Sequence, residues 1–207
     1  MSTTTLHHEQ RVILQNVRWN TYEALLHASQ ENGTLRLTYD RGQLEIMTPS
    51  AEHERLKEII TLLVNIIAEE KVTDISGFGS TTFRREDLER GFEAAACFYI
   101  RNAKKMRGKT NIDLNSDPAP ELVIEVDITQ SSLNKLSIFA QFGIEEVWRY
   151  DQRELRIFSL EKSDYVQLKK SKAFPDLNST VIAHFIDESR KTDRPTWLRR
   201  LREWARA

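Results

Sequence analysis

The sequence predicts an α/β fold in which a mixed β-sheet is flanked by helices. Three observations predict it. A buried strand, a helix and a second strand follow one another over residues 120–151. Segments that read as paired strands stand on both sides of that unit, and a long amphipathic helix precedes it. We expect one domain over residues 1–207, with a loose N-terminus at 1–15 and a C-terminal helix at 194–207.

The first half of the chain supplies two helices and a hairpin. Apolar residues at helical spacing predict a helix over 19–30, which an Asn-Gly pair ends. The alternating segments 35–39 and 43–47 are joined by Asp-Arg-Gly, which predicts a β-hairpin. A Pro-Ser pair then leads into a long helix over 52–70, whose apolar stripe faces the core.

The second half supplies the predicted mixed sheet and the closing helices. No internal repeat or low-complexity tract interrupts it. The predicted elements are, in order, strands at 96–101 and 122–128, a helix at 131–142, strands at 145–150, 155–160 and 165–169, and helices at 179–189 and 196–205.

Composition narrows the classes of function. The net charge of −1 gives no global basicity, so any nucleic-acid surface has to be local. The single cysteine, Cys97, excludes an internal disulfide and a cysteine-cluster zinc site. No apolar run approaches the roughly 20 residues of a membrane span, and the polar start lacks a signal-peptide core. We therefore expect a cytoplasmic protein.

Two carboxylates stand inside the most apolar strand. Glu125 and Asp127 interrupt the aliphatic run over 122–128. Because side chains alternate along a strand, both carboxylates point to the same side of the sheet. Ionised acids in such surroundings need a cation nearby. Two interpretations follow: a structural salt bridge of Glu125, or a pair of hard oxygen ligands for a divalent metal ion such as Mg²⁺.

Lys135 supplies a cation on the helix that follows. On a helical wheel it falls in the apolar arc, between Phe139 and Phe142. A lysine there either extends past the aromatic rings to water or is held inward by a carboxylate. Held inward, its ammonium would stabilise charge that develops on a phosphate, or position an attacking water.

Two further polar residues open the predicted helix over 52–70. Spacing alone favours a solvated Glu54 that interacts with the helix dipole, with a functional role as the alternative. His53 lies at the edge of the apolar arc, a position more typical of a packing histidine than of a ligand.

Several segments carry a family resemblance: YDRGQLEIMTPSAEHERLKEII, CFYIRN with RGKTNIDL, PAPELVIEVDITQSSLNKL, and FGIEEVWRYD followed by LRIFSL. In order, spacing and flanking turns, the chain resembles the Uma-type restriction endonucleases, a family of the PD-(D/E)xK nuclease superfamily. The resemblance spans roughly residues 39–177. It implies a restriction-endonuclease-like core with a Mg²⁺ (or Mn²⁺) site at the sheet edge, DNA as the substrate, and a homodimer with two active sites.

The resemblance also implies roles for individual residues. Glu125 matches the metal-binding acid of the family motif, and Glu54 matches a helix glutamate near the metal. Asp127 stands where the motif would place its lysine. In this family the lysine has moved to the following helix, and Lys135 is similar to it.

One position departs from the family pattern. Before the CFYI strand, relatives read Glu-Pro-Asp, and the aspartate is the bridging metal ligand. This chain has Ala95 at that place. Alanine cannot coordinate a cation, which puts metal affinity and cleavage in doubt. Glu93 does not compensate, because the relatives carry a glutamate there too.

The leading hypothesis is a Mg²⁺-dependent endonuclease that hydrolyses DNA phosphodiester bonds. Glu125 and Asp127 would bind the metal, Lys135 and Glu54 would assist catalysis, and Ala95 would impair the activity.

The alternative is a catalytically inactive DNA-binding or assembly module of the same fold. It would use the basic segment 101–109 and the arginine-rich C-terminal helix. That helix also fits a structural interpretation, in which Trp197 and Trp204 pack on the core or on a second subunit. A small cytosolic enzyme of another kind is a third reading, and no phosphate-binding glycine loop, nucleophile elbow or zinc motif supports it.

Overall fold

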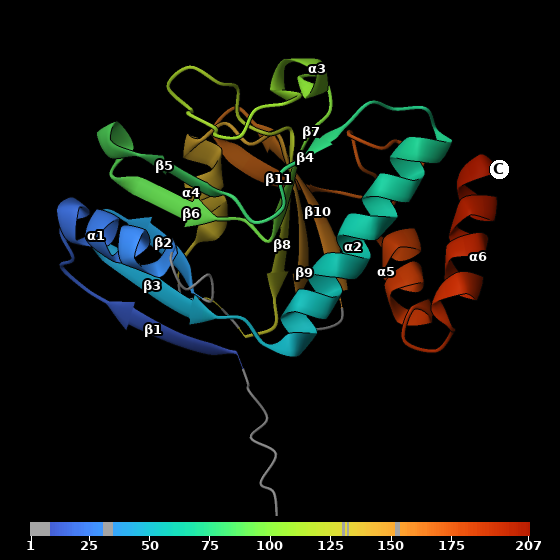
Figure 1. Cartoon of the computed structure of the whole chain (residues 1–207), viewed down its shortest axis with the longest axis horizontal. Helices are drawn as coiled ribbons and strands as arrows, with labels where there is room; N and C mark the ends of the chain where they lie inside the picture. The colour runs from blue at the N-terminus through green and yellow to red at the C-terminus, as the bar shows by residue number, and fades with distance from the viewer. Residues whose placement is uncertain (1–8, 31–34, 130, 132, 152–153) are drawn as a thin grey trace, which may run out of the picture.

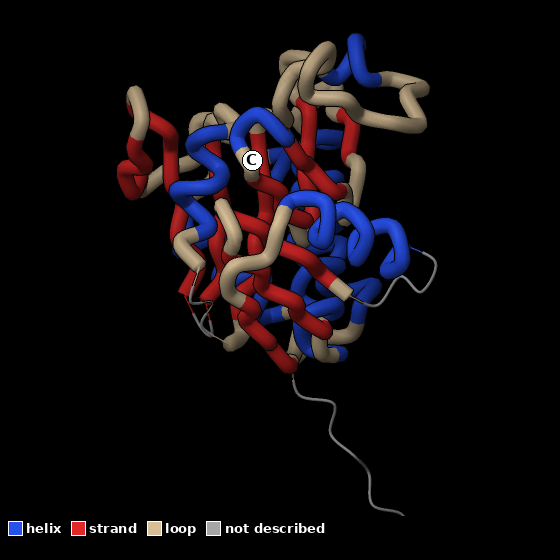
Figure 2. The backbone as a smooth tube through the Cα atoms, turned by 90° about the vertical axis from the view of Figure 1, so that its left-hand side faces the viewer, coloured by secondary structure: helices blue, strands red, loops and turns tan. Residues whose placement is uncertain are grey.

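The computed structural model of the chain describes residues 9–30, 35–129, 131, 133–151 and 154–207. Its strands form two sheets (Figure 1, Figure 2). Sheet A has the strand order β1-β3-β2-β6-β5, and sheet B has the order β11-β10-β9-β8-β7-β4. The bounds of the strands are β1 Gln10–Leu14, β2 Arg36–Asp40, β3 Gln43–Thr48, β4 Ser76–Gly77, β5 Thr82–Arg85, β6 Arg90–Glu93, β7 Ala96–Tyr99, β8 Leu122–Asp127, β9 Glu146–Asp151, β10 Glu154–Glu161 and β11 Asp164–Leu168.

The helices flank these sheets. The long helix α2 starts at Ser50, whose hydroxyl accepts a hydrogen bond from the backbone N–H of His53 and caps the helix. The bounds of the helices are α1 Trp19–Gln30, α2 Ala51–Glu70, the short 3₁₀ helix η1 Glu86–Leu88, α3 Ala103–Met106, α4 Lys135–Gln141, α5 Ser179–Glu188 and α6 Arg194–Arg206.

Sheet B is the mixed sheet that the sequence predicts. Strands β8 and β9 are parallel, with α4 between them in sequence, and the other pairs of this sheet are antiparallel. In Figure 1, α2, α5 and α6 lie on one side of sheet B, and α4 and sheet A lie on the other. The mixed α/β architecture flanked by helices is therefore confirmed, with an antiparallel second sheet added to it.

The two faces of sheet B pack into separate apolar clusters. Ile124 and Val126 of β8 belong to the cluster under α2, α5 and α6, whereas Val123 belongs to the cluster under α4. In the second cluster, the ring of Phe92 from sheet A lies 4.7 Å from that of Phe139 on α4, between centroids. The alternation places Glu125 and Asp127 on the α4 side of the sheet, between the two sheets.

The C-terminal helix α6 packs on the core. Trp197 is 1% exposed, and its Nε1 donates a hydrogen bond of 2.8 Å to the carbonyl oxygen of Phe185. Trp204 packs against the ring of Phe185, with centroids 5.8 Å apart. Arginines of α6 pair with Glu70 at the end of α2. The structural interpretation of this helix is confirmed.

Three expectations about the elements need correction. The expected loose N-terminus covers residues 1–15, but Gln10–Leu14 form β1 on β3, while residues 1–8 lie outside the described part. No strand is predicted between the helix over 52–70 and the strand at 96–101, but the charged residues 82–93 include β5 and β6. The helix expected at 131–142 begins only at Lys135, where Asn134 caps it.

The glycine at position 91 allows sheet A to pack closely on α1. A Cβ built on Gly91 would lie 2.1 Å from the hydroxyl of Tyr22, which is itself buried against Tyr39 with ring centroids 4.9 Å apart. We expect Gly91→Ala to lower the free energy of unfolding by about 1–3 kcal/mol, because either the ring or the strand has to shift. Guanidinium denaturation measures this.

Tyr22→Phe is the matched control for that prediction, because it removes the hydroxyl oxygen that a Cβ at position 91 would meet. Because the Tyr22 hydroxyl has no hydrogen-bond partner among the described residues, Tyr22→Phe costs little by itself. Combined with Gly91→Ala, it is expected to recover part of the lost stability. A Gly91→Ala protein as stable as the parent would contradict the close packing.

Candidate active site

Glu125 and Lys135 form the centre of the site. Glu125 is 3% exposed on β8, and its carboxylate accepts a hydrogen bond from the ammonium of Lys135 at the start of α4. The Lys135 side chain is 11% exposed, and its Nζ lies 3.9 Å from Oε1 of Glu45 on β3. Lys135 is thus held inward by carboxylates, which confirms the second of its two predicted orientations.

Asp127 is engaged by two arginines. Its Oδ1 lies 2.9 Å from a terminal guanidinium nitrogen of Arg11, and its Oδ2 lies 2.6 Å from one of Arg149 on β9. Both carboxylate oxygens therefore already have a cationic partner. The sequence predicted the shared face of Glu125 and Asp127, and the structure adds that different cations neutralise them.

Arg11 is a residue of the site that the sequence analysis missed. Its guanidinium contacts three carboxylates, those of Glu9 at 2.7 Å, Glu45 at 2.8 Å and Asp127 at 2.9 Å. Burial would lower the pKa of Arg11, but Glu45, Glu9 and Asp127 together raise it above its ordinary value. The available signal was the short run QRVIL, whose β-branched residues favour a strand.

Ala95 lies at a bend just before β7. The ladder pairs Ala96 with Ile124, so one further step would place Ala95 opposite Glu125. Ala95 is 4% exposed and packs in the apolar cluster under α2, which includes Leu56 and Val126. The position is buried and adjacent to the acidic strand, and it contributes no oxygen from its side chain.

Glu54 lies at the margin of the site. Its side chain is 40% exposed, pairs with Lys57, and lies 3.4 Å from a guanidinium nitrogen of Arg36. Arg36 in turn contacts Glu93 at 2.6 Å. These contacts hold Glu54 in a surface network with cations rather than in contact with Lys135.

His53 is buried beside the acids. Its side chain is 2% exposed, and its Nδ1 has no hydrogen-bond partner within the described residues, with Glu54 Oε1 at 3.5 Å. Burial lowers the pKa of His53, against the opposing influence of Glu125. His53 is therefore neutral at pH 7 and adds no further cation, but its unpartnered nitrogen differs from the satisfied packing histidine that the sequence favours.

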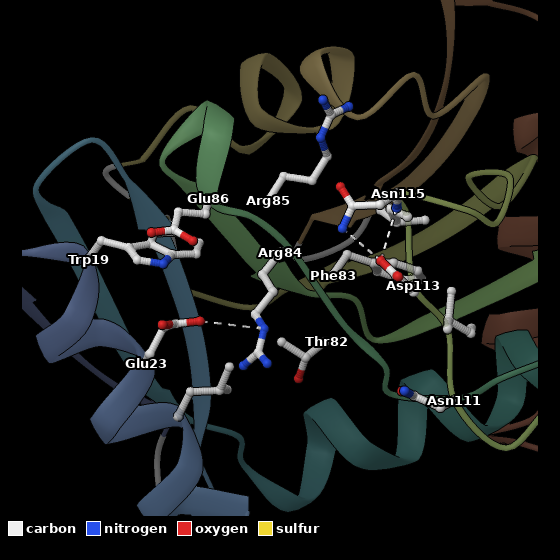
Figure 3. Close-up of a pocket in the computed structure, with 13 residues that line it drawn as sticks. Trp19, Glu23, Thr82, Phe83, Arg84, Arg85, Glu86, Asn111, Asp113 and Asn115 are labelled. Atoms are coloured by element: carbon white, nitrogen blue, oxygen red, sulfur yellow. Dashed lines mark hydrogen bonds and ion pairs between the residues drawn. The ribbon is translucent and has the colours of Figure 1, made fainter.

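A cavity of about 280 Å³ opens onto Glu125, Asp127, Lys135 and Arg149. A larger cavity of about 400 Å³ lies between α1, β5 and the segment 111–115 (Figure 3). Its wall carries Trp19, and Glu23 and Arg84 lie 3.9 Å apart across it. None of the residues predicted for the chemistry lines the larger cavity, so the smaller one is the candidate active site.

The side chains as arranged do not form a Mg²⁺ site. Mg²⁺ is usually held by one or two carboxylates together with water and phosphate oxygens. Here Asp127 pairs with two arginines, Glu125 pairs with Lys135, and the side chain of Ala95 offers no oxygen. Within the described residues, no group of three or more His, Cys, Asp or Glu side chains converges on one point.

The comparisons with known proteins give the class of protein and then the family. The family model Uma2, described as "Putative restriction endonuclease", matches residues 19–184. The chain belongs to the Uma2 family, which confirms the resemblance read from the sequence and supports a nuclease. Nucleases of this kind generally use divalent metal ions, and the family suggests DNA as the substrate.

No curated protein matches the chain. Four solved chains match, among them a protein of Anabaena variabilis ATCC 29413 described as "a putative nuclease belonging to DUF820". It is 12% identical, with a TM-score of 0.49, over 72% of this chain and 90% of that one. A likeness this distant says nothing about activity. In the described part of the chain, no helix combines the length and the apolar character that crossing a membrane requires.

Proposed function

We propose that this chain is a DNA endonuclease whose chemistry is centred on Glu125 and Lys135 and whose activity is impaired by Ala95. The observation that carries the proposal is the buried pair of the Glu125 carboxylate and the Lys135 ammonium at the floor of a cavity. Membership of a restriction endonuclease family supports the same chemistry.

The groups of the cavity suit a phosphodiester. Lys135 and Arg149 bring positive charge to a partly desolvated wall, where they would attract a phosphate and stabilise the charge that develops in the transition state. Glu125 holds the Lys135 ammonium in place and would accept a hydrogen bond from an attacking water. Glu54, at the margin, would orient groups from the side of α2.

A supercoiled-plasmid nicking assay tests this proposal. With Mg²⁺ or Mn²⁺ in the buffer, we expect slow nicking by the parent protein, which Glu125→Ala abolishes because the ammonium of Lys135 loses its partner. Glu58→Ala is the matched control, since Glu58 is an exposed α2 acid near Arg194. Nicking that survives Glu125→Ala would show that another site, or a contaminant, does the chemistry.

A second function has one observation in its favour. Both carboxylate oxygens of Asp127 pair with arginines, which leaves the metal site without a second free acid. This arrangement suits an inactive DNA-binding or assembly module. In the basic segment, Arg107 pairs with Asp74 at 2.7 Å, and Lys104 and Lys105 are exposed. DNA binding that weakens with salt, without any turnover, would favour this module over the endonuclease.

We also propose that the protein forms a homodimer in the cytoplasm. One chain holds one Glu125–Lys135 pair, and cutting both DNA strands is simplest with two such sites, so the proposed form is a homodimer. Its proposed location is the cytoplasm.

A further inference from the structure

Acidic and cationic side chains converge between the ends of sheets A and B. Glu9 and Arg11 come from the start of the chain, Glu45 comes from β3, Asp127 comes from β8 and Arg149 comes from β9. With Glu125 and Lys135, this makes four carboxylates that face three cations. The acids of the nuclease site are therefore largely neutralised by the protein itself.

We propose that Arg11 is a built-in counter-ion that occupies the place of a divalent cation and keeps this site from binding one. The inference rests on the proposed position of the nuclease site at Glu125 and Asp127. It concerns the binding of metal ions, whether or not the chain cuts DNA.

The contacts of Arg11 carry the proposal. Its side chain is 9% exposed, and its terminal nitrogens lie 2.7–2.9 Å from carboxylate oxygens of Glu9, Glu45 and Asp127. Its Nε also donates a hydrogen bond of 2.8 Å to the hydroxyl of Thr129. A planar guanidinium presents five donors in a fixed fork, which suits it to bridge several carboxylates at once.

Without the arginine, the same three carboxylates would be free to draw together around a cation, although with Arg11 in place they contact two different guanidinium nitrogens and, within the described residues, do not converge on one point. All three surround one guanidinium, and Oε2 of Glu9 is buried without a hydrogen-bond partner in the described part of the chain. A divalent ion is repelled while a positive charge lies within 3 Å of each acid, since like charges repel strongly where water is excluded, so the parent protein should bind such an ion only weakly. Removal of that charge leaves three hard oxygen donors that attract Mn²⁺ or Mg²⁺.

Arg11→Met tests the proposal, because methionine keeps much of the apolar stem and removes the charge. Isothermal titration with Mn²⁺ should show binding to the variant that is on the order of 100-fold tighter than binding to the parent protein. At a large excess of Mn²⁺, the melting temperature of the variant should rise by roughly 5–10 °C, and that of the parent should not. The added change Asp127→Asn should abolish the gain.

Arg156→Met is the matched control. Arg156, on β10 of sheet B, is another part-buried arginine, and it pairs with Asp151 at 2.7 Å, outside the cluster around Arg11. It should leave Mn²⁺ affinity unchanged. Two outcomes would overturn the proposal: tight Mn²⁺ binding by the parent that Asp127→Asn removes, or equal affinities of the parent and Arg11→Met.

A second measurement tests the proposal if the Arg11→Met variant does not fold. If Arg11→Met is unfolded in a chelator, circular dichroism during Mn²⁺ addition becomes the readout. Recovery of the folded spectrum supports a cation site in place of the guanidinium, and an unchanged spectrum at millimolar Mn²⁺ contradicts it. Neither readout uses DNA cleavage, so an absence of nuclease activity would overturn the proposed function and leave this inference standing.

Discussion

Ala95→Asp should raise the affinity for Mn²⁺ and Mg²⁺ on the order of 100-fold, because the family resemblance implies a metal-binding aspartate at this position, beside the strand that carries Glu125. The register of β7 on β8 would place residue 95 opposite Glu125, although Ala95 packs in the cluster on the α2 side of sheet B, so the new carboxylate has to turn toward Glu125 to share an ion with it. Ala95 itself is buried at 4% exposure, so a new carboxylate there would be poorly solvated and would gain strongly from a cation. Isothermal titration of the two proteins measures the difference.

Ala95→Asn separates charge from size in that experiment. The amide has nearly the shape of the carboxylate, and it lacks the charge that a divalent ion needs. We expect Ala95→Asn to bind metal no better than the parent protein. If Ala95→Asp folds and also binds no better, then residue 95 does not correspond to the bridging aspartate of the family.

Breaking the central ion pair should destabilise the fold by about 3–5 kcal/mol for each single change, Glu125→Gln or Lys135→Met. Both side chains are nearly inaccessible to water, at 4% and 11% exposure, so either charge left alone is poorly compensated. The double change removes both charges together. It should therefore cost clearly less than the sum of the two single changes.

Guanidinium denaturation of the four proteins completes this double-mutant cycle. The parent protein, the two single variants and the double variant are compared at one pH, near 7. Single changes that each cost less than about 1 kcal/mol would mean that Glu125 and Lys135 interact as a solvated surface pair. That result would remove the main support for a preorganised active site.

Local sequence patterns were sufficient to single out Glu125 and Lys135, the pair at the centre of the site. Alternation along 122–128 places Glu125 and Asp127 on one face, and helical spacing places Lys135 in the apolar arc, where an inward position was one of its two possible orientations. Both inferences depend on neighbours within about ten residues, and the structure agrees with both.

The counter-ions of Asp127 were not predictable in the same way. Arg11 reaches Asp127 across 116 residues of sequence, and Glu45 meets Lys135 from the other sheet. Such contacts follow from how the two sheets pack, which no local pattern contains. Strands β5 and β6 were missed for a related reason. Their many charged residues obscure the apolar pattern of Phe83 and Phe92, which pack in the cluster under α4.

Plasmid nicking by Ala95→Asp, compared with Ala95→Asp/Glu125→Ala, tests the central claim most directly. The claim is that Glu125 and Lys135 form a nuclease centre whose missing element is the acid at position 95. We predict metal-dependent nicking by Ala95→Asp well above that of the parent protein, and none by the double variant. Equal nicking by Ala95→Asp and the double variant would contradict the claim.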